Sequence, residues 1–188
     1  MDTLLKLIER TDEELATEAA REGSDGPAFV ALLDRYRDRV WRLCFRLMGN
    51  AADAQDAAQE VFVRLFLSRA KFDGRSKYAT WVHGVAVRTC LTLRRGRGRR
   101  RRHEETVGET ALDVRAADQR PAMPALALDL EQMLDSLDEE DRALVILKYS
   151  ENYSYEELAE IFGLSVSACK MRISRARERI QQKFGDRP

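Results

Sequence analysis

Residues that interrupt helices are scarce in this sequence, which has four prolines and ten glycines among 188 residues. Alternating β-branched and polar residues, the pattern of half-buried strands, are missing as well. Apolar residues instead recur at helical spacing almost throughout. We therefore predict an all-α protein, and the length suits one or two domains.

Cysteine and histidine are also rare. The three cysteines, Cys44, Cys90 and Cys169, are far apart, and no CxxC pair or nearby histidine pair exists, so we predict neither a metal site nor a disulfide framework. The two histidines, His83 and His103, are also far apart. With no nucleophile–base pair and no phosphate-binding glycine loop, we expect no enzymatic activity and no cofactor.

Long apolar runs are absent too. No stretch of about 18 apolar residues exists to span a bilayer, and the first residues lack the apolar core of a signal peptide. Three small thiols inside helical patterns are typical of a reducing compartment. We therefore expect a cytoplasmic protein with no membrane insertion of its own.

Charge of one sign does not dominate. Lysine and arginine number 32, as do aspartate and glutamate, so the net charge is zero. This balance argues against a uniformly basic nucleic-acid surface. Charge is nevertheless segregated, because residues 94–102 contain seven arginines whereas residues 129–141 are strongly acidic. Any binding to nucleic acid would have to come from such local surfaces.

The spacing of apolar residues predicts two helical domains. The first, residues 1–95, should contain a short helix after Thr11 and three longer ones, separated by Gly49-Asn50 and by a loop around Asp73-Gly74. Periodicity is lost over residues 96–124, which begin with the arginine run and end with prolines, so a flexible linker is predicted there. Residues 125–188 should form the second domain.

The second domain contains a helix-turn-helix pattern. Ser154 and Glu157 form a capping box that opens one helix, Gly163 ends it, and another begins near Val166. Helical hairpins of this kind also occur without DNA, so the pattern alone is only moderately specific. Its last helix adds a core face with apolar residues at steps of 3 and 4, namely Val166, Cys169, Ile173, Ala176 and Ile180.

The opposite side of that last helix carries small, adaptable or basic side chains, which suit a DNA groove. A solvated arginine-rich helix is the alternative reading, but the capping box and the glycine turn favour DNA. The predicted DNA-binding residues are Ser167, Lys170, Met171, Arg172, Ser174 and Arg175.

The first domain has an acidic face on the helix after Asn50. Its carboxylates are spaced by 3 and 4 residues, and glutamines border them. Such a face often means only solubility; if it has a partner, that partner should be a basic protein surface, since phosphate would be repelled. The acidic stripe, as we call it, consists of Asp53, Asp56, Gln59 and Glu60.

The loop and helix that follow interleave basic and aromatic residues, a pattern that suits unpaired bases. The alternative is that the rings are ordinary core; core is favoured for Trp81, and for Tyr78 both readings stay open. The predicted DNA-binding residues here are Phe72, Arg75, Ser76, Lys77, Tyr78 and Arg88.

Two segments resemble a known family. DAQDAAQEVFVRLF and the following KFDGRSKYATWVHGVAVRTCLTLRR resemble region 2 of bacterial RNA polymerase sigma factors, and LDSLDEEDRALVILKYSENYSYEELAEIFGLSVSACKMRISRARERI resembles region 4. The N-terminal part is similar to the small extracytoplasmic-function (ECF) group. The resemblance implies that the acidic stripe docks on core RNA polymerase, that the loop captures a base of the −10 element, and that the last helix reads the −35 element. It also implies an anti-sigma partner.

The sequence departs from the family pattern at several places. Ala168-Cys169 and Met171 stand in the last helix where the family commonly has Thr-Val and Ser, and His83 and Arg88 replace an aromatic residue and an asparagine. Base preference is therefore open, as is the role of the arginine run. Two rival readings are a stand-alone helix-turn-helix transcription regulator with a helical dimerisation domain and a helical adaptor without nucleic-acid binding.

Overall fold

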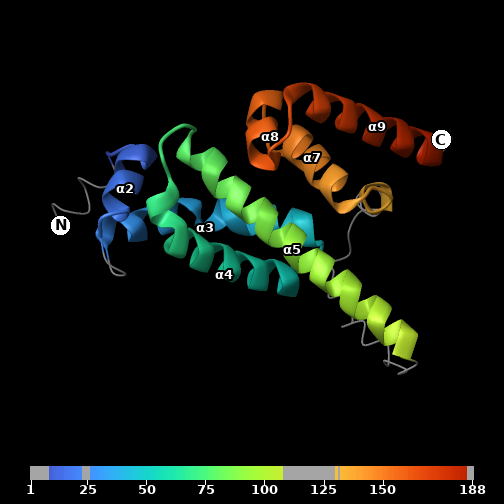
Figure 1. Ribbon diagram of the computed structural model, residues 1–188, viewed down its shortest axis with the longest axis horizontal. Helices are drawn as coiled ribbons and strands as arrows, with labels where there is room; N and C mark the ends of the chain where they lie inside the picture. The colour runs from blue at the N-terminus through green and yellow to red at the C-terminus, as the bar shows by residue number, and fades with distance from the viewer. Residues whose placement is uncertain (1–8, 23–25, 108–129, 131, 186–188) are drawn as a thin grey trace.

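The computed structural model describes residues 9–22, 26–107, 130 and 132–185, with the backbone alone over residues 99–107. Over these residues the protein consists of helices joined by turns and loops, as Figure 1 shows. The predicted all-α fold is confirmed. The elements are α2 (Asp12–Ala19), α3 (Pro27–Met48), α4 (Ala51–Ser68), the 3-10 turn η1 (Arg69–Lys71), α5 (Tyr78–Val107), α7 (Glu139–Ser150), α8 (Tyr155–Phe162) and α9 (Val166–Phe184).

Helices α2 to α5 pack together as the N-terminal bundle. The apolar stripe predicted for α3 is its core face: Tyr36, Val40 and Leu43 are buried, and α4 and α5 add Val61 and Val82 to the same core. Full burial of such an aliphatic side chain contributes about 1.5–3 kcal/mol. Gly49, at φ 86°, ends α3 in the left-handed conformation, which lets α4 fold back along it.

Helix α5 is longer than the sequence suggested. We expected it to end near Arg95, but it continues through the whole arginine run, residues 94–102, to Val107, beyond the end of α4 (Figure 1). Arginine is a good helix former, and a glycine such as Gly96 or Gly98 costs a helix only about 1 kcal/mol. Loss of apolar periodicity therefore marked the end of the buried face and not the end of the helix. Residues 108–124 of the predicted linker lie outside the described residues.

Local hydrogen bonds define the ends of the C-terminal helices, α7 to α9. Asp138 accepts backbone bonds at the start of α7, and the predicted capping box of α8 is present in both directions between Ser154 and Glu157. Gly163, at φ 65°, makes the turn, and Ser165 then caps α9. An isolated eight-residue helix such as α8 is marginal in water, so these caps and tertiary packing hold it.

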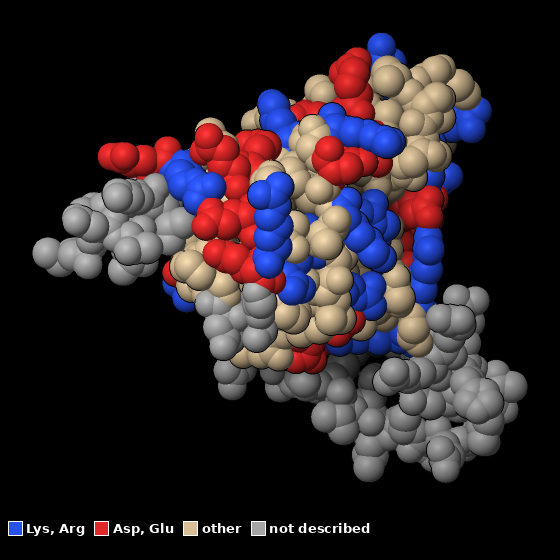
Figure 2. Space-filling model, turned by 60° about the vertical axis from the view of Figure 1, so that its left-hand side comes forward, with Lys and Arg blue, Asp and Glu red and all other residues tan. Residues whose placement is uncertain are grey.

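The C-terminal helices pack directly on the N-terminal bundle. In Figure 1, α7 and α8 lie along one side of α5, and α9 is on the outer side, away from the bundle. Acidic and basic side chains are interspersed over the face in Figure 2, in keeping with the zero net charge. None of the described helices is long and apolar enough to cross a membrane.

Candidate nucleic-acid interface

The outer side of α9 matches the face predicted to bind DNA. Cys169, Ile173 and Ala176 are buried against α7 and α8, which turns the opposite side of the helix to solvent. We call that exposed side the reading face. Its residues Ser167, Lys170, Met171, Ser174 and Arg175 are all exposed.

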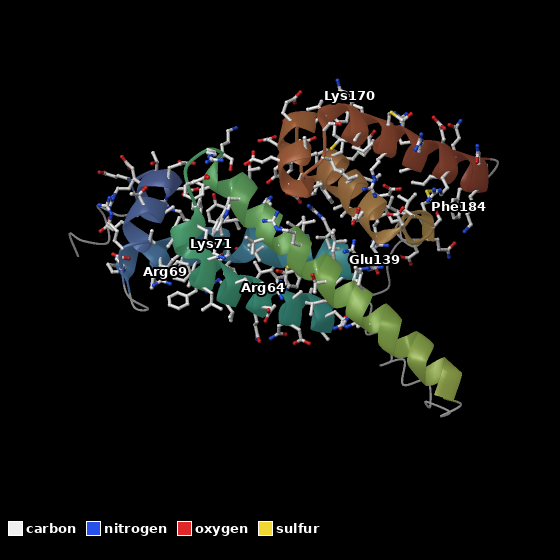
Figure 3. The ribbon with its side chains drawn as sticks, viewed as in Figure 1. Arg64, Arg69, Lys71, Glu139, Lys170 and Phe184 are labelled. Carbon is white, nitrogen blue, oxygen red and sulfur yellow. The ribbon has the colours of Figure 1, made fainter. Side chains whose placement is uncertain are left out.

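Several contacts orient side chains of the reading face. The Lys170 ammonium lies 5.4 Å from the centre of the Tyr155 ring, and Figure 3 shows Lys170 on the outer side of α9. The Ser174 hydroxyl donates to Glu178 at 3.2 Å. Met171 is half exposed, at 51% of its surface. A protruding methionine suits an apolar contact such as a thymine methyl group.

Arg172 is engaged within the C-terminal helices. Its guanidinium donates to Asp141 at 2.7 Å and to Glu140 at 2.8 Å, and it lies 3.6 Å from Asp138. The bonds to Glu140 from Arg172 and then from Arg95 hold the pKa of that carboxyl below its usual value. The predicted DNA contact of Arg172 stays a prediction, since it would require these bonds to be exchanged.

The aromatic residues of the predicted −10 loop form a cluster. The Phe72 ring centre lies 5.1 Å from that of Tyr78 and 5.8 Å from that of Trp81. Tyr78 is only 3% exposed, and burial raises the pKa of its hydroxyl. Its ring belongs to the core, while Phe72 and Trp81 are partly exposed at the edge. Tyr78 can support the loop, and a stacking role for it stays a prediction.

The basic residues of this region fall into two groups. The side chains of Arg75 and Lys77 are 87% and 80% exposed, and Ser76 between them is partly exposed. Arg88 instead turns toward the C-terminal helices, where it donates to the carbonyl of Ile161 in α8 at 3.1 Å. Arg75 lies 3.0 Å from Asp73 of the same loop, and Lys77 lies 3.9 Å from Glu157 of α8, so the positive charge of the loop is largely exposed and partly paired.

The acidic stripe lies along α4. Asp56 and Gln59 are exposed. Asp53 accepts from the Asn50 amide at 2.8 Å and also pairs with Arg97 of α5, and Glu60 accepts from Arg64 at 2.7 Å. Of the four predicted docking residues, Asp56 and Gln59 are therefore exposed to solvent, whereas Asp53 and Glu60 are bonded to neighbouring side chains.

Sequence reasoning did not find the contacts between the N-terminal bundle and the C-terminal helices. The hydroxyl of Tyr153 bonds the His83 imidazole, Arg95 pairs with Glu140, and Arg46 pairs with Glu151. These partners lie 45 or more residues apart in the sequence, so helical periodicity carries no signal for them.

Family models match both halves of the chain: sigma-70 region 2 over residues 32–100 and sigma-70 region 4 over residues 127–180. The ECF RNA polymerase sigma factor SigW of Bacillus subtilis is 31% identical over 86% of this chain and 91% of its own. The chain belongs to the ECF group of sigma-70 factors. SigE of Mycolicibacterium smegmatis, also an ECF sigma factor, is 34% identical over 93% of this chain and 69% of its own length.

Solved structures agree with this sigma-factor fold. CnrH, in complex with the cytosolic domain of CnrY, aligns with a TM-score of 0.65 at 23% identity, over 94% of this chain and 99% of CnrH. The sigma factor RpoE of Bartonella quintana, in complex with the anti-sigma factor NepR, aligns with a TM-score of 0.63 at 22% identity, over 85% of this chain and 98% of RpoE. At these identities the likeness concerns the fold.

Proposed function

We propose that this sigma factor binds core RNA polymerase and directs it to promoters by recognising a −35 and a −10 element. The observation that carries the proposal is the reading face of α9, which is exposed along its length on a helix whose other side is buried. The factor itself supplies binding and positioning, and the polymerase supplies the chemistry. The proposed place of action is the cytoplasm, where the polymerase acts.

We assign the −35 contact to α9. A helix with small residues at its front enters the major groove closely, and an arginine such as Arg175 can bond the O6 and N7 atoms of a guanine. Lys170 is well placed for a base edge or a phosphate, and Met171 favours an apolar group. Arg177 and Arg179, exposed on the flanks, suit the phosphates on either side.

We assign the −10 contact to the loop between η1 and α5. The largely exposed side chains of Arg75 and Lys77 can exchange Asp73 and Glu157 for the phosphates of an unpaired strand, and the half-buried edge of Phe72 offers apolar surface to a base. Extruding a base costs a few kcal/mol, which these contacts must offset. Ser76 can donate to the same nucleotide, and Arg88 would join once released from Ile161.

Protein partners fit other surfaces. Asp56 and Gln59 are open to a basic surface of core polymerase, and Asp53 and Glu60 can exchange their intramolecular arginines for arginines or lysines of that partner. We also propose an anti-sigma partner, because a sigma factor of similar fold, RpoE of Bartonella quintana, was solved in complex with the anti-sigma factor NepR.

Run-off transcription with core polymerase and this protein as the only added factor tests the proposal. We expect promoter-dependent transcripts from a panel of candidate promoters, and weak duplex binding by the protein alone. The rival, a stand-alone helix-turn-helix regulator, predicts specific duplex binding without polymerase and no promoter-dependent transcript from the core enzyme.

A further inference from the structure

The loop between η1 and α5, residues 72–77, is bonded to the short helix α2 at the end where it begins. Just before the loop, the Arg69 guanidinium donates to the carbonyls of Ala19, the last residue of α2, and of Glu22, each at 3.1 Å. It also donates to the carbonyl of Phe66 at 2.8 Å and lies 4.2 Å from the centre of that ring. Figure 3 shows Arg69 on the side of the bundle where α2 lies. Because a guanidinium presents its donors in a rigid plane, these bonds fix the start of the loop relative to the end of α2.

The other end of the loop is bonded to the same helix through Glu13. Helix α5 begins at Tyr78, and the Trp81 amide donates to the Lys77 carbonyl at 3.2 Å, so Lys77 stands where a capping side chain would be expected. A lysine side chain has donors only and cannot accept from a backbone amide. The Glu13 carboxylate accepts from the Tyr78 amide instead, at 3.1 Å, and its negative charge suits the start of a helix. A residue 65 positions earlier in the chain thus supplies the missing cap.

Helix α2 is itself held in place. A capping box between Thr11 and Glu14 defines its start. Asp12 accepts from the Tyr36 hydroxyl and, at 2.6 Å, from Arg35, both of α3. The inner side of α2 is buried in the core of the N-terminal bundle. An isolated helix of eight residues would be marginal in water, so these contacts are what make α2 a fixed support.

The same contacts extend to the aromatic ring of the loop. The Tyr36 ring centre lies 5.5 Å from that of Tyr78, and the Tyr78 ring centre lies 5.1 Å from that of Phe72. Phe72 therefore packs, through Tyr78, on a residue that anchors α2. Its position depends on α2 as well as on the loop's own backbone.

We propose that α2 is a clamp for residues 72–77 and that Glu13 is a positioning residue within it. By bonding both ends of the loop, α2 holds it in one shape before DNA binds, and less conformational freedom is then lost on binding. Glu13 acts through the loop and contacts no DNA. That α2 fixes the loop follows from the contacts above, whereas the role of the loop in holding an unpaired base rests on the proposed function.

Glu13 is the better of the two ends to test. It is exposed, so its truncation removes little packing, whereas Arg69 is partly buried and has several acceptors. Glu13→Ala removes the acceptor of the Tyr78 amide, and Glu13→Gln keeps a side-chain oxygen that can accept from it. The matched control is Glu9→Ala, which truncates an exposed glutamate just before α2. All variants are made in the full chain.

Hydrogen exchange of the Tyr78 amide measures the clamp directly. The first amides of a helix have no acceptor within that helix, so protection of this amide reports the bond to Glu13. We expect Glu13→Ala to speed its exchange about tenfold, because hydrogen bonds to charged groups are among the stronger ones. Glu13→Gln should restore most of the protection, and Glu9→Ala should leave it unchanged. Unaltered exchange in Glu13→Ala, or no recovery in Glu13→Gln, overturns the clamp.

DNA binding by the holoenzyme tests the positioning role. For the single non-template strand of a promoter that the wild-type holoenzyme transcribes, affinity should fall about fivefold in Glu13→Ala and recover in Glu13→Gln. Affinity for a duplex carrying only the −35 element should not change, which a general loss of folding would not allow. Equal losses for both DNAs, or faster exchange with no loss of affinity, overturn the positioning role. A wild-type holoenzyme that transcribes from no promoter overturns the proposed function alone, and hydrogen exchange still decides whether α2 holds the loop.

Discussion

The N-terminal bundle and the C-terminal helices expose their predicted binding residues in different ways. The reading face of α9 is open along the whole helix because the opposite side supplies the core. In the bundle, Tyr78 is buried and Arg88 is bonded to α8, whereas the loop residues Arg75 and Lys77 are largely exposed and pair with Asp73 and Glu157. A chain of zero net charge can thus expose one predicted DNA-binding surface fully while part of the second is buried or bonded within the chain.

The sharpest test of this difference is Arg175→Ala. A bidentate contact to a base contributes about 1–3 kcal/mol, so transcription from the preferred promoter should fall about 5- to 150-fold. Lys183→Ala, at the exposed end of the same helix, is the control and should change little. Run-off assays at equal holoenzyme concentration measure both. Equal effects of the two substitutions would remove Arg175 from the reading face.

On the bundle, the double variant Asp56→Arg with Glu60→Arg should weaken association with core polymerase about tenfold or more. Like charges across an interface cost several kcal/mol, and both positions lie on the outer side of α4. Asp34→Arg, at an exposed position of α3, is the control. Circular dichroism should show an intact fold, and unchanged affinity in a pull-down assay would contradict the assignment of the acidic stripe.

Acid should open the contact between the N-terminal bundle and the C-terminal helices. In the closed state Tyr153 bonds His83, and in the open state the two parts separate. Burial, and then the charge of Arg39, lowers the pKa of His83 from 6.5 to about 4. A group whose pKa is lowered in the closed state favours closure above its ordinary pKa and loses that contribution as the pH falls from 6.5 toward 4. If opening exposes the ring, the open-to-closed ratio should rise about tenfold between about pH 7.5 and about pH 5.5.

Energy transfer between dyes on cysteines introduced at Leu67 of α4 and Gln181 of α9, both exposed, measures this response, and His83→Phe should abolish it. Other charged groups line the same cavity of about 340 Å³, so an unchanged response in that variant would assign the effect to one of them instead. They are Arg39 of α3, Lys77 before α5, and Glu151 and Glu157 of the C-terminal helices.

The smallest expected effect concerns the capping box. Ser154→Ala removes the hydroxyl that accepts from the Glu157 amide, which should cost about 1 kcal/mol. The melting temperature of the C-terminal helices should fall by about 4–8 °C, given their small size. Ser167→Ala, on the reading face, should leave it unchanged. A thermal melt followed by circular dichroism compares them, and equal melting temperatures would argue against capping as a determinant of α8.

Local signals in the sequence predicted much of the fold. The stripe through Tyr36 and Val40, the capping box at Ser154 and the turn at Gly163 depend on residues within a few positions of one another, and each has the predicted structure. The reading face of α9 followed from the same reasoning, since its buried side could be identified by periodicity alone.

Long-range contacts were beyond such reasoning. The sequence could not show that Arg88 reaches Ile161 or that Arg172 is held by Asp141, because those pairings depend on how helices pack. The sequence did not decide whether Tyr78 lies in the core or at the surface, because an aromatic residue at the start of a helix suits both places. The end of α5 was missed for another reason: arginines continue a helix without an apolar face.

Mapping transcription starts with reconstituted holoenzyme tests the central claim most directly. Core polymerase with this sigma factor should initiate at discrete sites, each preceded by a recurring −10 and −35 element, and Arg175→Ala should shift or abolish preference at the −35 element alone. If the core enzyme initiates identically with and without the protein, while the protein alone protects a specific duplex site, the claim that it is the promoter-recognition subunit is contradicted.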